Sequence, residues 1–171
     1  MKKTLLFLAT LTLFVLQANA QRISENAIGI RVGDSDGFGT EINYQRALTE
    51  NNRLELGLGW NTSDNVNTFR LVGLYQWVWT LDGNFNWYAG AGAGVGQVSF
   101  DDDFPGDPNN ETFFLAAGDI GIEYNFDIPL LLSLDFRPEI GFGDFRDDVD
   151  FGIALGTVSY THLTLPTTPY V

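Results

Sequence analysis

The chain has 171 residues, with 22 Asp and Glu against nine Lys and Arg, no cysteine and a net charge of −13. Both lysines lie within the first three residues, so the rest carries seven arginines against 22 acidic residues, a net charge near −15. So acidic a chain argues against nucleic acid as a partner, because nucleic-acid binding needs a basic surface. The absence of cysteine excludes disulfides, and the length leaves room for one domain.

The first segment, Met1–Ala20, has the features of a secretory signal peptide. Lys2 and Lys3 form a basic start, Leu5–Leu16 an apolar run, and Ala18-Asn19-Ala20 a small-residue cleavage site before Gln21. The apolar run is too short to span a bilayer as a helix. We therefore expect residues 1–20 to be cleaved and the protein to leave the cytoplasm.

After the signal, apolar residues alternate with polar or small ones in eight short stretches. In Arg53–Asn61, for example, three leucines and Trp60 occupy one face, and charged, polar and glycine residues occupy the other. Lipid-facing and lumen-facing side chains alternate in this way along transmembrane β-strands. The pattern predicts an all-β domain over residues 21–157, an eight-stranded antiparallel up-and-down transmembrane β-barrel. The expected strands are Ala27–Gly33, Gly39–Ala47, Arg53–Asn61, Thr68–Trp79, Phe85–Ser99, Phe113–Phe126, Leu130–Phe142 and Val149–Thr157.

The connections between these strands alternate between short and long. The short ones are rich in turn-forming residues: Thr49–Asn52, Leu81–Asn84 and Asp127–Pro129. The long ones are mostly acidic: Asp34–Phe38, Thr62–Asn67, Asp101–Thr112 and Gly143–Asp148. In an up-and-down barrel, this alternation puts the short turns on the periplasmic side and the long loops outside.

Aromatic residues gather at the strand ends, as amphipathic rings do at the two interfaces of a membrane. We expect one belt beside the short turns: Tyr44, Trp77, Trp79, Phe85, Trp87, Tyr124 and Phe126. The second belt is expected beside the long loops: Trp60, Phe69, Phe113, Phe142 and Phe151.

Together, the signal, the eight alternating stretches, the short turns, the acidic loops and the glycine-rich wall resemble the small outer-membrane β-barrel family of the OmpX/OmpA type. The resemblance covers about Ala27 to Thr157. It implies a cell outer-membrane location, contact with outer-membrane lipids and lipopolysaccharide, and folding by the barrel-assembly machinery. Barrels of this family usually end on an aromatic residue that this machinery reads.

The C-terminal segment departs from that pattern. Thr157–Thr167 match, residue for residue, the translation of a common transposase-based sequencing adapter. Pro166 and Pro169 are also unsuited to a strand that must pair on both sides. We therefore expect residues 158–171 to form a non-native tail outside the barrel, the alternative being a genuine Thr/Pro-rich extension.

Charged residues recur at the inward-facing positions of the expected strands. We interpret them as an interlocked ion-pair network, because a barrel of eight strands is only wide enough to be filled by its own side chains. Residues i and i+4 on a strand lie about 13 Å apart, too far for two carboxylates to share a proton. The network is expected to contain Arg31, Glu41, Arg53, Glu55, Arg70, Asp119, Glu123, Asp135, Arg137 and Glu139, with Asp150 as a further inward charge.

Three other features are weaker candidates. Gly90, Gly92, Gly94 and Gly96 resemble a nucleotide-binding loop, but no helix follows to bind a phosphate, so we expect them to make room in the lumen for bulky Arg and Tyr side chains. The outward-facing Pro138 removes one ladder donor and predicts a β-bulge. The oxygen ligands of one acidic loop could hold Ca²⁺ or Mg²⁺ together with lipopolysaccharide phosphates, although a solvated acidic rim is the simpler interpretation: Asp101, Asp102, Asp103 and Asp107.

The sequence offers no catalytic constellation and no cofactor motif. The single histidine, His162, falls in the suspect tail, so a general base for a hydrolase or acyltransferase is missing. We expect a non-catalytic barrel with a structural or surface-interaction role through its acidic loops. The alternatives are a narrow passive pore, a lipid-modifying outer-membrane enzyme, and a soluble lipocalin-like barrel, whose inner face would be apolar.

Overall fold

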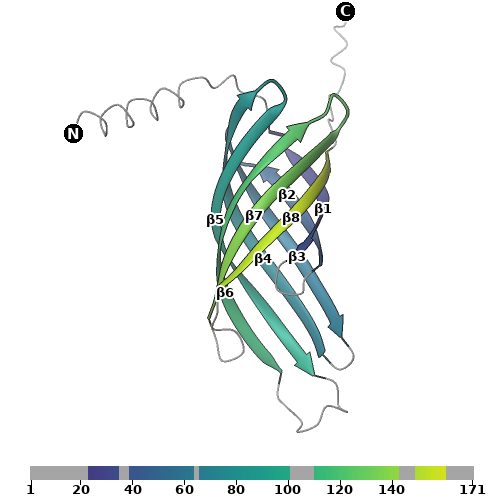
Figure 1. The fold of residues 1–171 in the computed structure, drawn as a ribbon, viewed down its shortest axis with the longest axis vertical. Coiled ribbons are helices and arrows are strands. Elements are labelled where there is room, and N and C mark those ends of the chain that lie inside the picture. The colour runs from purple at the N-terminus through teal and green to yellow at the C-terminus, as the bar shows by residue number, and fades with distance from the viewer. Residues whose placement is uncertain (1–22, 35–38, 64–65, 101–109, 143–148, 161–171) are drawn as a thin grey trace, which may run out of the picture.

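The computed structural model describes residues 23–34, 39–63, 66–100, 110–142 and 149–160, which form eight antiparallel strands (Figure 1). The predicted fold class is confirmed, because the strands close into one barrel in the order β1 to β8. Within these described residues, no helix is long and apolar enough to cross a membrane. The strands are β1 (Asn26–Asp34), β2 (Thr40–Ala47), β3 (Asn52–Ser63), β4 (Val66–Asp82), β5 (Phe85–Phe100), β6 (Glu111–Asn125), β7 (Leu130–Phe142) and β8 (Val149–Tyr160).

The barrel closes where β1 pairs with β8, from Ala27 opposite Tyr160 to Asp34 opposite Ile153. Closure gives every strand a neighbour on both sides, so the wall has no open edge along these ladders. We call the end that carries the β2–β3, β4–β5 and β6–β7 turns the turn end, and the opposite end the loop end. Gly83 permits the tight β4–β5 turn, because its φ of +53° is a conformation that other residues rarely adopt.

Side chains alternate between the two faces of the wall, as the sequence predicts, and the β4–β5 register shifts once, between Thr80 and Asp82 beside the turn. In β8, Ile153 faces outward and is 61% exposed, whereas Ala154 faces the interior and is 2% exposed. Almost all exposed large apolar residues, such as Ile28, Leu56 and Phe136, lie at such outward positions. The outer surface therefore suits hydrocarbon and the inner surface collects the polar residues.

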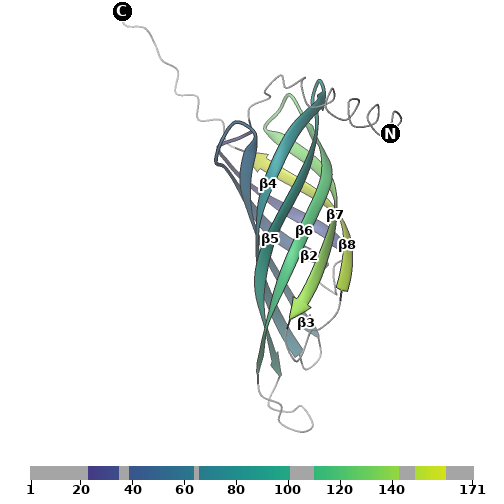
Figure 2. The same ribbon diagram turned by 90° about the vertical axis from the view of Figure 1, so that its left-hand side faces the viewer.

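The wall is not of even height. Strands β4, β5 and β6 contain 17, 16 and 15 residues, whereas β1 and β2 contain nine and eight. Figures 1 and 2 show β5 and β6 reaching beyond the shorter strands at the loop end. One side of the barrel is therefore much taller than the other.

Two expected boundaries are wrong because the alternation continues beyond them. The long loop expected at Thr62–Asn67 is mostly strand, since β3 and β4 stay paired up to Ser63 opposite Val66. At the other end of the chain, β8 continues past Thr157 to Tyr160, because Val158 packs inward and Ser159 lies opposite both Ile28 and Leu130. Residues 158–160 are thus part of the barrel, and the rest of the expected tail lies outside the described residues, as does the expected signal peptide.

Pro138 does not produce the expected bulge. The β6–β7 register is the same on both sides of it, with Ala117 opposite Glu139 and Ile120 opposite Phe136, and only the intervening pairs are lost. Gly118 lies against the proline ring, and a Cβ built there would be 3.1 Å from Pro138 Cγ. The small neighbour thus accommodates the ring without an inserted residue.

The wall makes one prediction about stability. Replacing the outward-facing Leu56, which lies halfway along β3, by arginine should destabilise the barrel by about 2–4 kcal/mol, because the charge must enter hydrocarbon near the bilayer midplane. The same replacement at Leu81, beside the β4–β5 turn, should cost at most about 1 kcal/mol, because the side chain reaches the interface. Urea unfolding in phospholipid vesicles measures both, and equal losses would contradict the assignment of the outward face.

Candidate functional site: the charged lumen

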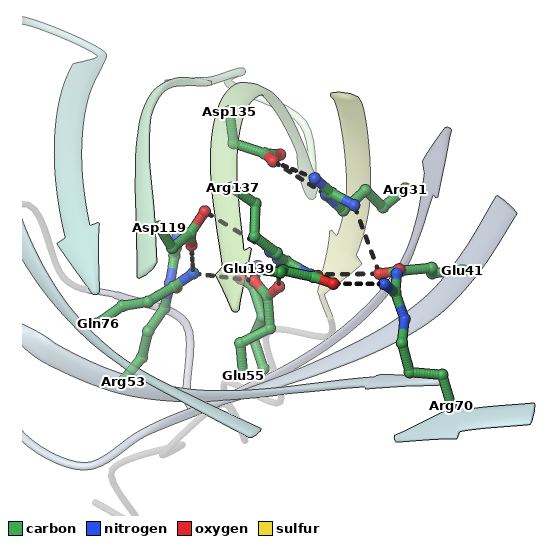
Figure 3. Close-up of polar contacts among 11 residues, drawn as sticks. Arg31, Glu41, Arg53, Glu55, Arg70, Gln76, Asp119, Asp135, Arg137 and Glu139 are labelled. Atoms are coloured by element: carbon green, nitrogen blue, oxygen red, sulfur yellow. Dashed lines mark hydrogen bonds and ion pairs between the residues drawn. The ribbon is translucent and has the colours of Figure 1, made fainter. Parts of the chain in front are cut away.

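The structure places all ten residues of the expected network inside the barrel, each at most 5% exposed. They come from six of the eight strands, and those labelled in Figure 3 point toward one another across the lumen. Strand β5 contributes none of them, and Asp150 on β8 is only half-buried. Inward-facing positions on separate strands are thus brought together by closure of the sheet.

Glu41 on β2 is the first centre of this network. Its carboxylate accepts a hydrogen bond from Arg137 Nη1 at 3.2 Å and another from Arg70 Nη2, and it lies 3.6 Å from Arg31 Nη1. These arginines come from β7, β4 and β1 respectively. One carboxylate thereby links three other strands across the lumen (Figure 3).

Arg137 on β7 is the second centre. Besides Glu41, its guanidinium donates from Nη2 to Glu55 Oε1 at 2.8 Å, and its Nε lies 3.8 Å from Asp119 Oδ1. The guanidinium has several donors in a fixed planar arrangement and can engage several carboxylates at once. Arg137 thus connects β2, β3 and β6 to β7.

The other ion pairs link β1 to β7, β4 to β7 and β3 to β6. Arg31 donates two hydrogen bonds to Asp135 Oδ1, at 2.9 and 2.7 Å, and Arg70 donates to Glu139 at 2.7 Å. Arg53 lies 2.8 Å from Glu123 and 4.8 Å above the ring of Tyr88, a cation–π distance. Each of the four buried arginines therefore has at least one carboxylate partner.

Buried amides extend the network, although they were not among the residues predicted from the sequence. Gln76 donates to Glu55 at 3.3 Å and also to Asp119, while it accepts from Arg53 at 2.6 Å. Gln45 donates to Glu55 at 2.9 Å, and Asn86 donates to Glu123 at 3.0 Å. All three occupy inward positions, so strand parity was the signal that could have identified them.

An apolar cluster lies beside the charges on the tall side of the lumen, and the sequence did not point to it. The cluster consists of Val72, Leu74, Val98, Phe113, Leu115 and Ala117, from β4, β5 and β6. Phe113 was expected in an outward belt, but it is 2% exposed and points inward, while its neighbour Phe114 faces outward at 61% exposed. Strand β6 begins at Glu111, so Phe113 lies within the strand and takes the same inward face as Leu115 and Ala117.

The glycines of β5 make room for residues other than those expected. A Cβ at Gly96 would overlap the ring of Phe113, and one at Gly94 would lie 3.1 Å from Leu115 Cδ1. At Gly90 it would lie 2.8 Å from Gln76 Cγ. The space therefore accommodates Phe113, Leu115 and Gln76, and not arginine or tyrosine.

The lumen is closely filled. The hollow at the turn end, which includes Gln45, Arg53, Asn86 and Glu123 in its lining, has a volume of about 20 Å³, enough for one or two water molecules. Among the described residues, no group of three or more His, Cys, Asp or Glu is arranged to hold a metal. The candidate cation ligands Asp101, Asp102, Asp103 and Asp107 lie outside the described residues.

Comparison with known proteins shows which solved folds this barrel is similar to. No protein-family model and no curated protein matches the sequence. The solved N-terminal β-barrel domain of OprF from Pseudomonas aeruginosa is similar with a TM-score of 0.61 and 14% identity, over 80% of this chain and 98% of that chain. Neisserial surface protein A has a TM-score of 0.59 and 12% identity, over 80% and 95%. Ail, the attachment invasion locus protein of Yersinia pestis, has a TM-score of 0.53 and 15% identity, over 80% and 97%.

At these identities the similarity shows the fold. The chain is a small eight-stranded outer-membrane-type β-barrel, and the charged, filled interior is inconsistent with the soluble lipocalin-like alternative.

The network predicts a specific loss of stability. Arg137→Met should cost about 3–5 kcal/mol, because it leaves Glu41, Glu55 and Asp119 short of a buried counter-charge. The same substitution at the exposed Arg46 should cost less than about 1 kcal/mol. Urea unfolding in vesicles, followed by tryptophan fluorescence, would compare them, and similar losses would mean that the lumen charges do not brace the barrel.

Proposed function

We propose that this protein is a non-catalytic outer-membrane barrel with a structural or surface-interaction role. The observation that carries the proposal is the lumen itself, in which paired charges, amides and packed apolar residues occupy the interior. A barrel filled in this way supplies a rigid wall and a platform for its loops. The acidic loops at the loop end are then the surface that partners meet.

The chemistry of the lumen supports a role without catalysis. Its acidic residues engage arginines or amides, and each of the four buried arginines is ion-paired. No histidine or cysteine occurs in the described ranges to serve as a general base or a nucleophile. We propose structural ion pairs, with no cofactor, in place of acid–base groups.

We further propose that the loop end faces outward and the turn end faces the periplasm, with contacts to outer-membrane lipids and lipopolysaccharide around the wall. Assembly would use the barrel-assembly machinery, as the family resemblance implies. The short β3–β4 connection shows that the alternation of loop length is less strict than the sequence indicated. The orientation therefore rests on the three turns at the turn end and on the acidic loops opposite.

Cysteine labelling tests this orientation, and the absence of native cysteine gives a clean background. Asn110→Cys at the loop end should react with a membrane-impermeant maleimide on intact cells. Asp82→Cys at the turn end should react only after the outer membrane is opened. Labelling of Asp82→Cys alone on intact cells would mean that the orientation is the opposite of the one proposed.

Single-channel recording tests the filled lumen against the pore alternative. Purified protein in planar bilayers should give no stable conductance, because the network leaves no room for a continuous column of water. Steady ohmic channels of uniform size would instead support a passive pore.

A further inference from the structure

Arg46 differs from every other cationic side chain in the described part of the chain. The other four described arginines are buried in the lumen, whereas Arg46 is exposed on the outer face of β2, one residue before that strand ends. It forms no ion pair with another described residue. Arg46 is therefore the described cationic side chain that is available to bind an anion from outside the protein.

The aromatic residues around Arg46 place it at the level of the membrane interface. Tyr44 precedes it by two residues on the same face, and two strands away the rings of Tyr75 and Trp77 meet edge to face at 5.0 Å. Such rings concentrate at the headgroup level of a bilayer, and long basic side chains near strand or helix ends extend toward the same level. The anionic group available there is the phosphate of a phospholipid.

Hydrogen-bond donors flank Arg46 on both neighbouring strands. Asn26 lies directly opposite on β1, and its Oδ1 accepts from the Tyr44 hydroxyl at 2.6 Å, which leaves its NH₂ group as a donor. On β3, Leu54 lies opposite Arg46, and Asn52, two residues before Leu54 in the chain, lies closer to the turn. Asn52 Nδ2 donates to the Tyr75 hydroxyl at 2.8 Å, so the hydroxyl proton is also left to donate.

Two exposed carboxylates lie on the same part of the rim. The carbonyl of Glu25 accepts a hydrogen bond at 3.1 Å from the backbone N–H of Ala47, the residue after Arg46, and Glu50 lies in the turn that follows β2. These acids favour a ligand that carries a positive group beside its phosphate. They disfavour a headgroup with a net negative charge.

We propose that Asn26, Arg46 and Asn52, with Glu25 and Glu50, form a binding site for a zwitterionic phospholipid headgroup. Arg46 binds the phosphodiester, the flanking amides donate to its remaining oxygens, and the rim carboxylates hold the ammonium group. Leu54 and Leu56 supply the apolar wall along which the acyl chains lie. The assignment to the periplasmic leaflet rests on the proposed function and its orientation, but the headgroup chemistry does not.

Native mass spectrometry of the folded barrel in detergent tests the site directly. The barrel is incubated with equimolar phosphatidylethanolamine and phosphatidylglycerol that carry identical acyl chains. The wild type should retain mainly the ethanolamine lipid. Arg46→Gln should reduce that adduct about tenfold, since a hydrogen bond to a charged group contributes more than a neutral one. The double variant Glu25→Gln/Glu50→Gln should bring the two lipids toward equal retention.

Tyr124→Phe is the matched control, because it removes one polar group from the turn-end rim on β6 and keeps the ring contacts to Phe85 and Phe126. It should retain the wild-type lipid pattern. An unchanged ethanolamine adduct in Arg46→Gln, or equal binding of both lipids by the wild type, would overturn the proposal. Because detergent removes any dependence on orientation, such a failure would be distinct from a failed surface-labelling experiment.

Discussion

The whole barrel depends on one constraint, which is that its inward-facing polar groups must satisfy one another within a narrow lumen. An eight-stranded barrel has room inside for side chains and little else. A charge buried there without a partner costs several kcal/mol, whereas a well-paired one is close to neutral. Glu41 and Arg137 meet this constraint for much of the barrel, because each engages partners from three other strands.

The apolar cluster and the glycines complete the packing beside the charges. On the tall side of the wall, Phe113 occupies the space that Gly96 leaves, and the neighbouring valines and leucines fill the rest. The lumen is therefore packed by two kinds of interaction, ion pairing among residues of six strands and hydrophobic packing among residues of β4, β5 and β6. Together they fill most of the narrow lumen with side chains, and we therefore propose a structural role and not transport.

Alternation alone was enough to predict the strands, the closed topology and the inward position of every charge in the network, because a period of two fixes which face each residue takes. It was not enough to predict partners. That Arg137 reaches Glu41, Glu55 and Asp119 depends on the stagger between strands that are distant in sequence. Phe113 was misassigned for a related reason, since the expected strand began at Phe113 and an aromatic residue at a strand end suits a membrane belt as well as a lumen.

The end of β8 shows a second limit of sequence reasoning. The match of Thr157–Thr167 to a translated sequencing adapter predicted a segment outside the barrel, but Val158 and Tyr160 still fit the alternation and the register with β1. Pairing with strands on both sides thus extends β8 beyond the boundary that the match predicted.

Hydrogen exchange of the arginine side chains, measured by NMR on the folded barrel, tests the closed lumen most directly. The Nε–H groups of Arg31, Arg53, Arg70 and Arg137 should exchange slowly, because paired carboxylates and packed neighbours exclude water. The exposed Arg46 should exchange rapidly in the same sample. Rapid exchange at all five arginines would contradict a lumen filled by its own side chains.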